Sequence, residues 1–295
     1  MKHYKTLSDL FRDSGWPPPQ QPLLSVVRCA DSCNIGNQEF TGDFYMIWFK
    51  KLISGVVLYG RTSYDHANGS MGFAAPRQAM SFENLEFEED GFVIFVHEDY
   101  LLGHPLHTRI RKYGYFDYEA NEALHLSPTE EKIMWDLFWK MQAEHTGNTD
   151  EYSREIILSH LDALLKYSER FYKRQFINRA ILTQKTTSRF NDALANWADN
   201  TEAGEGLPTV NSLAAAMHLS PRYLSDLLKQ ETGKTAMELI HVFLIKEAKN
   251  LLKASDNSIS ETAYKLGFEN LPYFSRLFKK EVGVSPNQFK KQALN

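Results

Sequence analysis

The chain of 295 residues has few cysteines, since Cys29 and Cys33 are the only two. A pair spaced C-x3-C with no two further sulfur or imidazole ligands nearby is a poor zinc site. We therefore expect both cysteines to be reduced thiols, and we expect no bound metal.

Long hydrophobic runs are also missing. No stretch of about 18 apolar residues could form a membrane-spanning helix, and the first residues lead into no apolar segment of a secretory signal. These absences predict a soluble, cytoplasmic protein with no membrane partner.

Sequence signatures of catalysis are missing as well. No nucleophile elbow, phosphate-binding loop or dinucleotide-binding fingerprint occurs. The histidines are scattered: His104 and His107 form the tightest pair, whereas His66 and His97 lie on separate segments. We expect no catalytic residues, no cofactor and no enzymatic activity.

What the chain does contain is an ordinary globular composition with an uneven charge. It is 43% hydrophobic and 24% charged, with a formal net charge of −4. Residues 207–295 carry a net charge of +4 and the remaining residues −8. A mildly basic end on an acidic chain is typical of nucleic-acid binding at one end only, although chance could produce the same asymmetry.

Residues from about 22 to 119 are predicted to be rich in β-strands. Apolar runs at 54–60 and 91–96 read as strands, and Asn68-Gly69 predicts a hairpin between Tyr64 and Phe73. Short strands at regular spacing favour a small barrel or sandwich. The aromatic residues that could line a pocket there, or simply form its core, are Phe44, Tyr45, Trp48, Phe49, Tyr59 and Phe73.

A helical region follows at about 128–176. Ser127-Pro128-Thr129-Glu130 has the pattern of a capping box, and a long helix is predicted from about 151 to 175. The helices could cover the β-domain or pack against the same pair in a second chain. The residues expected to form the dimer contact are Ile157, Leu161, Leu164 and Leu165. A further helix is predicted at about 187–197, and the polar segment 199–206 is expected to be the linker between domains 1–198 and 207–295.

The C-terminal part contains one short pattern twice. Residues 223–233 and 273–283 share Tyr, Ser, Leu, Lys, Glu and Gly at an offset of 50. Apolar positions at i, i+3 and i+4 before each glycine predict two amphipathic helices. Each follows a shorter predicted helix and a tight turn, which is the plan of a helix-turn-helix. Two units in tandem predict that the chain reads two successive major grooves.

A longer helix is predicted between the two units. Thr235 and Glu238 have capping-box spacing, and the apolar pattern continues to about Ala254. Some 20 residues make a rod of about 30 Å. One turn of B-DNA is about 34 Å, so this helix has the length needed to place two recognition helices one turn apart.

Exposed side chains in the N-terminal half of each recognition helix are expected to reach base edges. They are Arg222, Ser225 and Asp226 in the first helix and Leu271, Pro272, Ser275 and Arg276 in the second. An arginine can fork onto guanine, Asp226 could accept from cytosine, and Leu271 and Pro272 could contact only thymine methyl groups. The expected phosphate contacts are Ser220, Lys229, Lys279 and Lys280. The alternative for each charged group is a solvated surface charge, and it is strongest for Asp226.

These residues resemble the DNA-binding domain of the AraC/XylS family of bacterial transcriptional regulators over about 207–292. The most specific stretches are 263–268, 273–280 and 283–286. The resemblance implies an α+β protein with an N-terminal cupin-like barrel for sensing and dimerisation. It also implies an all-α C-terminal domain of two helix-turn-helix units joined by a linker helix. Thr262, Asp226, Pro272 and Lys290 depart from the family's usual residues, which puts the operator sequence in doubt.

The sequence therefore predicts a one-component regulator that binds double-stranded DNA. Its expected partners are a second copy of the chain, a small-molecule effector and RNA polymerase, since the resemblance favours an activator. Two alternatives stay open. One is a DNA-binding regulator without a ligand, which a thermal-shift screen would separate from a sensor. The other is a cupin enzyme with a DNA-binding tail, which metal analysis would reveal.

Overall fold

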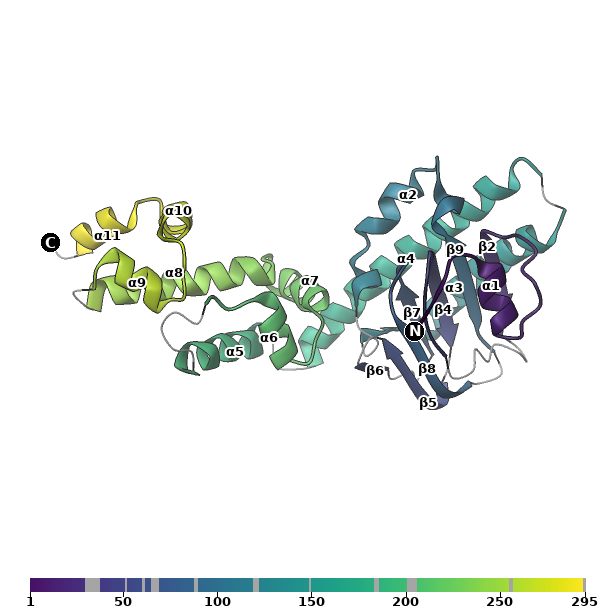
Figure 1. Ribbon diagram of the computed structural model, residues 1–295, viewed down its shortest axis with the longest axis horizontal. Coiled ribbons are helices and arrows are strands. Elements are labelled where there is room, and N and C mark those ends of the chain that lie inside the picture. The colour runs from purple at the N-terminus through teal and green to yellow at the C-terminus, as the bar shows by residue number, and fades with distance from the viewer. Residues whose placement is uncertain are drawn as a thin grey trace. The chain divides into compact units, whose positions relative to one another are not determined.

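The computed structural model describes the chain in two compact units, Met1–Asn178 and Arg179–Asn295. The described residues are 1–29, 38–50, 52–59, 62–64, 69–87, 90–118, 122–148, 150–182, 186–200, 206–254 and 257–293. Figure 1 shows a first unit of strands with helices and a second unit of helices alone. This is the α+β organisation predicted from the sequence.

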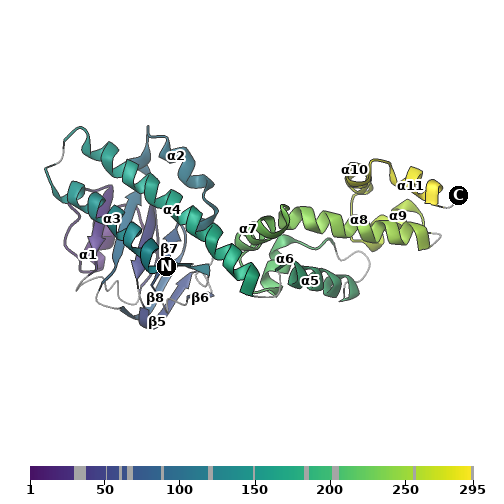
Figure 2. The same ribbon diagram turned by 180° about the vertical axis from the view of Figure 1, so that it is seen from behind.

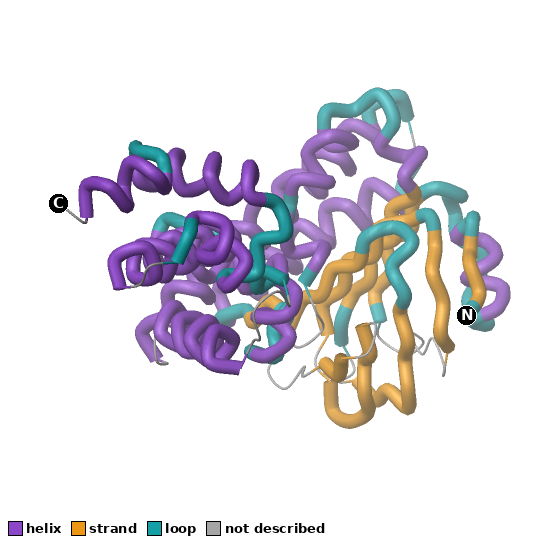
Figure 3. The backbone as a smooth tube through the Cα atoms, turned by 60° about the vertical axis from the view of Figure 1, so that its left-hand side comes forward, coloured by secondary structure: helices purple, strands orange, loops and turns teal. Residues whose placement is uncertain are grey.

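The first unit holds two five-stranded sheets, drawn in orange in Figure 3. One has the order β1-β3-β8-β5-β6 and the other β10-β7-β4-β9-β2. The strands are β1 (Lys2–Tyr4), β2 (Leu24–Arg28), β3 (Gln38–Gly42), β4 (Phe44–Lys50), β5 (Leu52–Tyr59), β6 (Thr62–Tyr64), β7 (Ser70–Ala74), β8 (Met80–Phe87), β9 (Phe92–His97) and β10 (Leu124–His125).

The remaining elements of the first unit are helical. They are α1 (Leu7–Asp13), η1 (Glu98–Leu101), α2 (Leu106–Arg109), η2 (Ile110–Lys112), η3 (Gly114–Asp117), α3 (Pro128–Thr146) and α4 (Ser153–Leu182). Ser127 and Glu130 form the predicted capping box at the start of α3. Figure 2 shows α3 and α4 lying across one face of the strands.

The expected closed barrel is not found among the described residues, where the two sheets are separate and open. The expected hairpin between Tyr64 and Phe73 is also wrong, because β6 pairs with β5 whereas β7 pairs with β4 and β10. Asn68 itself lies outside the described residues. Short alternating strands bury the same pattern in a barrel or a sandwich, so the sequence could not separate the two.

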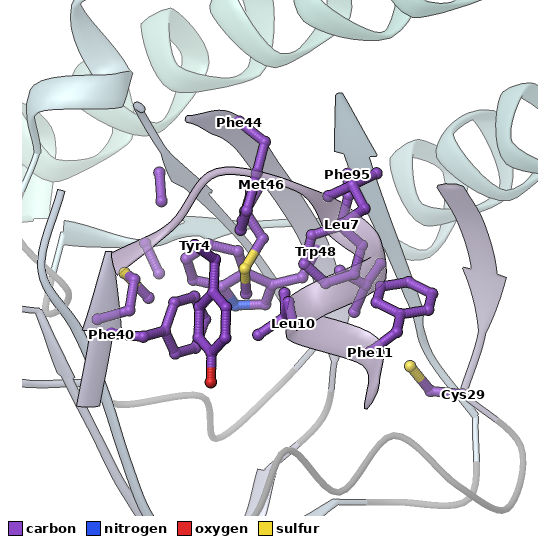
Figure 4. Packing of buried hydrophobic residues seen from close by; sticks show 14 residues of the cluster. Tyr4, Leu7, Leu10, Phe11, Cys29, Phe40, Phe44, Met46, Trp48 and Phe95 are labelled. Carbon is purple, nitrogen blue, oxygen red and sulfur yellow. The ribbon is translucent and has the colours of Figure 1, made fainter. Parts of the chain in front are cut away.

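Strand β4 is buried on both faces, which makes it the centre of the first unit. Phe44, Met46 and Trp48 point into a cluster with Tyr4 and Phe95 (Figure 4). The alternate residues of the strand point to the opposite face because successive side chains of a strand alternate. There Phe49 contacts Trp135 of α3 with ring centroids 5.9 Å apart, and Tyr45 contacts Phe116 at 5.2 Å.

The aromatic residues considered for a pocket are therefore core residues wherever their side chains are described. Phe44, Tyr45, Trp48, Phe49 and Phe73 are each at most 5% exposed. The Tyr59 side chain lies outside the described residues.

The four residues expected to form the dimer contact are also core residues. Ile157 is 3% exposed, and Leu161, Leu164 and Leu165 are fully buried within the first unit. An apolar stripe looks the same whether it packs against its own sheet or a second chain, and these four side chains pack within their own unit. Among the described side chains of α4, the exposed apolar residues are Ile156 and Ile177.

The cysteines also differ from expectation. Cys29 is disulfide-bonded rather than a reduced thiol. The sequence offers Cys33 as its one partner within the chain, and Cys33 lies outside the described residues. Within the described part of the chain, no helix is long and apolar enough to span a membrane.

The second unit is built of seven helices in its described part. They are α5 (Thr186–Asn200), α6 (Val210–Ala216), α7 (Pro221–Thr232), α8 (Ala236–Ala254), α9 (Ile259–Lys265), α10 (Leu271–Val282) and α11 (Pro286–Ala293). The unit begins at Arg179, so α5 belongs to it, whereas the sequence placed residues up to 198 in the first domain. Residues 201–205 of the expected linker lie outside the described residues.

Candidate nucleic-acid interface

Helices α6 and α7 form the first helix-turn-helix unit. Thr209 begins α6 with a capping box to Ser212. The Ser220 hydroxyl accepts a hydrogen bond from the Tyr223 backbone N–H at 3.2 Å, and Pro221 occupies the first turn of α7. A proline is favourable there because the first N–H groups of a helix have no partner within it. The sequence alone predicts both helix starts.

Helices α9 and α10 repeat this construction. Ser258 and Glu261 form a capping box at the start of α9. Asn270 begins α10 by accepting from the Tyr273 backbone N–H at 2.9 Å. Gly233 ends α7 and Gly283 ends α10, both with positive φ. Glycine adopts this conformation without the steric cost that a Cβ atom brings.

The turns of the two units are built alike. In the first, Leu219 N donates to Ala214 O at 3.0 Å; in the second, Phe268 N donates to Ala263 O at 2.9 Å. The residue before each donor is left-handed, with φ of 57° at His218 and 83° at Gly267. The equivalent turn residues Leu219 and Phe268 lie 49 positions apart, whereas the equivalent helix residues Tyr223 and Tyr273 lie 50 apart. The second turn therefore has one more residue before its recognition helix than the first.

The glycine in the second turn has a second constraint. A Cβ atom at Gly267 would collide with the backbone carbonyl of Gly206. The segment that precedes α6 therefore packs directly against the turn between α9 and α10. Only glycine satisfies both the left-handed backbone and this close approach.

The apolar stripe of each recognition helix is committed to the core. Leu224, Leu227 and Leu228 of α7 are at most 1% exposed, and Phe274 and Phe278 of α10 are fully buried. The opposite faces of α7 and α10 are therefore the ones that can meet a ligand as large as DNA.

All seven residues expected to read bases lie at least partly exposed. Arg222, Leu271, Pro272 and Arg276 are exposed, and Ser225, Asp226 and Ser275 are half-buried. On α7, Arg222 Nε donates to Asp226 Oδ2 at 3.2 Å. This intrahelical ion pair offsets the charge of Arg222 on the surface that would face DNA.

Helix α10 is more basic than α7. The charged residues of α7 sum to zero, whereas Arg276, Lys279, Lys280 and Glu281 give α10 a net charge of +2. Within the described residues, Arg276 and both lysines form no ion pair and no hydrogen bond from their side chains. The second recognition helix therefore presents three uncommitted cationic groups.

The residues expected to contact phosphate differ among themselves. Lys229, Lys279 and Lys280 are exposed. Ser220 is only 2% exposed and its hydroxyl caps α7. The structure thus gives Ser220 a role in helix capping and leaves its side chain little surface for a phosphate.

The sequence reasoning missed Tyr273 and His241. Tyr223 is fully buried, yet its counterpart Tyr273 is 38% exposed, and its hydroxyl lies 3.4 Å from His241 Nε2 on α8. Burial lowers the pKa of His241, although Glu281 and Glu238 act in the opposite direction. The signal was available, because Tyr273 falls outside the apolar stripe of α10.

Helix α5 is held to the first recognition helix by one carboxylate. Glu231 of α7 accepts from the backbone N–H groups of Thr186 and Thr187 at 3.0 and 2.9 Å, and from Thr187 Oγ1 at 2.7 Å. Burial raises the pKa of Glu231, but these hydrogen bonds outweigh it and the pKa is lowered. A distant side chain therefore caps the start of α5.

Two of the departures from the family pattern have structural roles. Thr262 is fully buried and its Oγ1 donates to Ser258 O at 3.0 Å. Lys290 Nζ donates to Asn257 O at 2.7 Å. Both hydrogen bonds fix the start of α9.

The histidines considered as metal ligands have other contacts. His104 Nδ1 accepts from the Leu106 N–H at 3.1 Å, His97 Nδ1 accepts from the Asp99 N–H at 3.1 Å, and His107 Nε2 lies 3.1 Å from Arg111. His66 lies outside the described residues. Among the residues that are described, no group of three or more His, Cys, Asp or Glu could hold a metal ion.

The fold and the exposed surface of the second unit define a double helix-turn-helix DNA-binding domain. Comparison with known proteins names its family. Residues 213–292 match a family model described as a helix-turn-helix domain. This part of the chain is an AraC-type helix-turn-helix domain.

Two named relatives match up to about half of the chain. A regulator of Escherichia coli named RhaS, an HTH-type transcriptional activator, is 31% identical over 151 residues, which cover 51% of this chain and 50% of that protein. Another, YijO of Escherichia coli, an uncharacterised HTH-type transcriptional regulator, is 32% identical over 120 residues, 40% of this chain and 41% of that protein. The chain thus matches half or less of the length of these relatives.

A solved structure is similar to part of the chain. It is the C-terminal domain of AraT, a response regulator from Geobacillus stearothermophilus, with 30% identity and a TM-score of 0.33. The match covers 38% of this chain and 87% of that one.

Proposed function

We propose that this protein is a one-component transcriptional regulator that binds double-stranded DNA in two adjacent major grooves through α7 and α10. The observation that carries the proposal is the repeated recognition helix, buried on one face and polar on the other. The uncommitted cations of α10 match the negative charge of a phosphate backbone.

The spacing of the two helices supports simultaneous contact. Helix α8 has 19 residues, which at 1.5 Å per residue is roughly 28 Å. This is close to the length of one turn of B-DNA, about 34 Å. Two recognition helices set at the ends of such a rod would meet successive grooves on the same side of the duplex.

A selection from a random duplex library with the full chain tests this function. We expect a site with two short blocks about one helical turn apart. Recovery of a single block would contradict two-groove reading. No enrichment at low or physiological salt would contradict the DNA-binding function itself.

The roles of the first unit are part of the same proposal. We propose that it binds a small-molecule effector and that the protein acts as a homodimer which activates transcription through contact with RNA polymerase. In the single chain, the side chains expected at the dimer contact are already packed within the first unit; they are Ile157, Leu161, Leu164 and Leu165. The exposed Ile156 and Ile177 of α4 are the better candidates. A monomeric mass by sedimentation at micromolar concentration would contradict the dimer.

A further inference from the structure

A cleft of about 330 Å³ lies on the first unit, lined by Trp16 to Pro19, strand β2 and the C-terminal end of α3. A second hollow of about 290 Å³ shares Gln20 and His145 with it. We call the two together the His145 cleft. Its size is at the lower end of the range for small-molecule sites.

Two nearly buried polar side chains line this cleft without a partner. Ser25 of β2 is 3% exposed and His145 of α3 is 8% exposed. Within the described residues, neither side chain forms a hydrogen bond. The atoms Ser25 Oγ and the His145 ring nitrogens are not among the fully enclosed atoms that lack a partner. Both residues line the cleft, so a molecule bound there can reach them.

An unpartnered polar group in such a place is unusual, because most buried polar atoms form hydrogen bonds. Because their polar atoms are open to the cleft, a bound molecule can replace solvent there and hydrogen-bond to Ser25 and His145. Burial lowers the pKa of His145. Near neutral pH the ring is then uncharged and offers one donor and one acceptor.

One side of the larger hollow is apolar. The apolar residues of the larger hollow are Phe11, Trp16, Pro17, Pro18, Pro19, Val26 and Val27. The Trp16 backbone N–H donates to Phe11 O at 2.8 Å, and the Trp16 ring packs edge-on against the Phe11 ring with centroids 5.1 Å apart. Three successive prolines have restricted backbones, so this wall loses little freedom when a ligand binds. Flat rings suit such a surface.

The charged groups at the cleft are committed to other partners. Arg28 donates to both carboxylate oxygens of Asp90 at 2.9 and 3.0 Å. Arg154 donates to the backbone carbonyls of Tyr100 and Leu102 at 2.7 and 2.8 Å. Asp150 accepts from the backbone N–H of Ser153 at 3.0 Å. The cleft therefore matches a neutral ligand better than an ion.

We propose that the His145 cleft binds a small neutral molecule that combines a flat apolar ring with a hydrogen-bonding group held by Ser25 and His145. Its role as the effector site rests on the proposed regulatory function. Occupation joins the proline segment and β2 to the end of α3.

The test uses the full chain with selectively ¹³C-labelled histidine. The neutral probes are benzamide, nicotinamide and phenol, and the charged counterparts are benzoate and benzamidinium. We expect the neutral probes to shift the His145 ring resonance and to raise Tm, since a ligand that binds only the folded state stabilises it. His145→Leu and Gln142→Trp should each weaken binding at least tenfold. The second variant fills the cleft and keeps both polar groups.

His160→Gln is the matched control, because His160 is a half-buried histidine of α4 that does not line the cleft. It should bind the probes like the parent. No response to any neutral probe, or binding by either cleft variant as tight as that of the parent, would overturn the site. Tighter binding of benzoate or benzamidinium would overturn the neutral class. DNA binding measured without probes in the same preparations reports separately on the regulatory function.

Discussion

Arg222 and Asp226 lie one turn apart on α7 and form an ion pair, with Arg222 Nε 3.2 Å from Asp226 Oδ2. Fifty residues later the equivalent positions hold Pro272 and Arg276. In the first recognition helix the charge of Arg222 is therefore neutralised by Asp226 of the same helix. In the second, Arg276 forms no ion pair within the described residues. The two units have the same backbone and different electrostatic surfaces.

Arg276→Ala is expected to weaken binding to the selected site by roughly 1–3 kcal/mol and to relax specificity at one position.

Lys279→Ala should weaken binding evenly across sequences and reduce the slope of log K against log salt by about one. Titrations at several salt concentrations measure both effects. An unchanged sequence preference in the Arg276 variant would remove its assigned role in base reading.

Asp226→Asn should strengthen DNA binding. The change removes a carboxylate from a surface that faces phosphates and releases Arg222, so a gain of about 0.5–1 kcal/mol at low salt is expected. The control is the same change in an Arg222→Ala background, where the released arginine is absent and the gain should shrink. Weaker binding of the single variant would instead mean that Asp226 contacts a base.

Glu231→Gln should lower the free energy of unfolding of the second unit by about 1 kcal/mol at pH 7, a figure already reduced because the carboxylate is partly exposed. The stabilisation is present above the unfolded-state pKa of about 4.5. It is lost as the pH falls through the lowered pKa of the folded state. Denaturant titrations between pH 3 and 7 test this, with the exposed Glu269→Gln as control. The same pH dependence in parent and variant would contradict it.

Gly267→Ala and Gly283→Ala separate two costs of adding a side chain. Both glycines have positive φ, of 83° and 88°, but only at Gly267 would a Cβ atom meet another backbone, that of Gly206. We expect a loss of about 1–2 kcal/mol at Gly283 and a clearly larger loss at Gly267. Equal losses in thermal unfolding would show that the contact with Gly206 does not constrain the turn.

Local sequence patterns predicted the helices of the second unit closely. Each helix start depends on an N-cap side chain and the backbone N–H three residues later, which the sequence alone can indicate. The capping residues Ser258 and Asn270 and the terminal Gly233 need no tertiary information. Ser220 was expected to contact phosphate, but its depth of burial depends on the packed unit and could not be predicted.

Relationships between distant segments were beyond the sequence. The placement of α5 depends on hydrogen bonds from Thr186 and Thr187 to Glu231, some 45 residues away. The burial of Leu161 and Leu164 depends on which surface their helix meets. The His145 cleft joins residues 25 and 145, which no periodicity connects.

Because β4 is completely buried, a fragment of the first unit must keep the elements that cover both faces of this strand. Its two faces hold two aromatic cores, one with Tyr4 and Phe95 and one with Trp135 and Phe116. A fragment that ended before α3 would expose Phe49 and Phe92 to water. We therefore expect the strands and helices of this unit to fold and unfold together, and a fragment without α3 not to fold on its own.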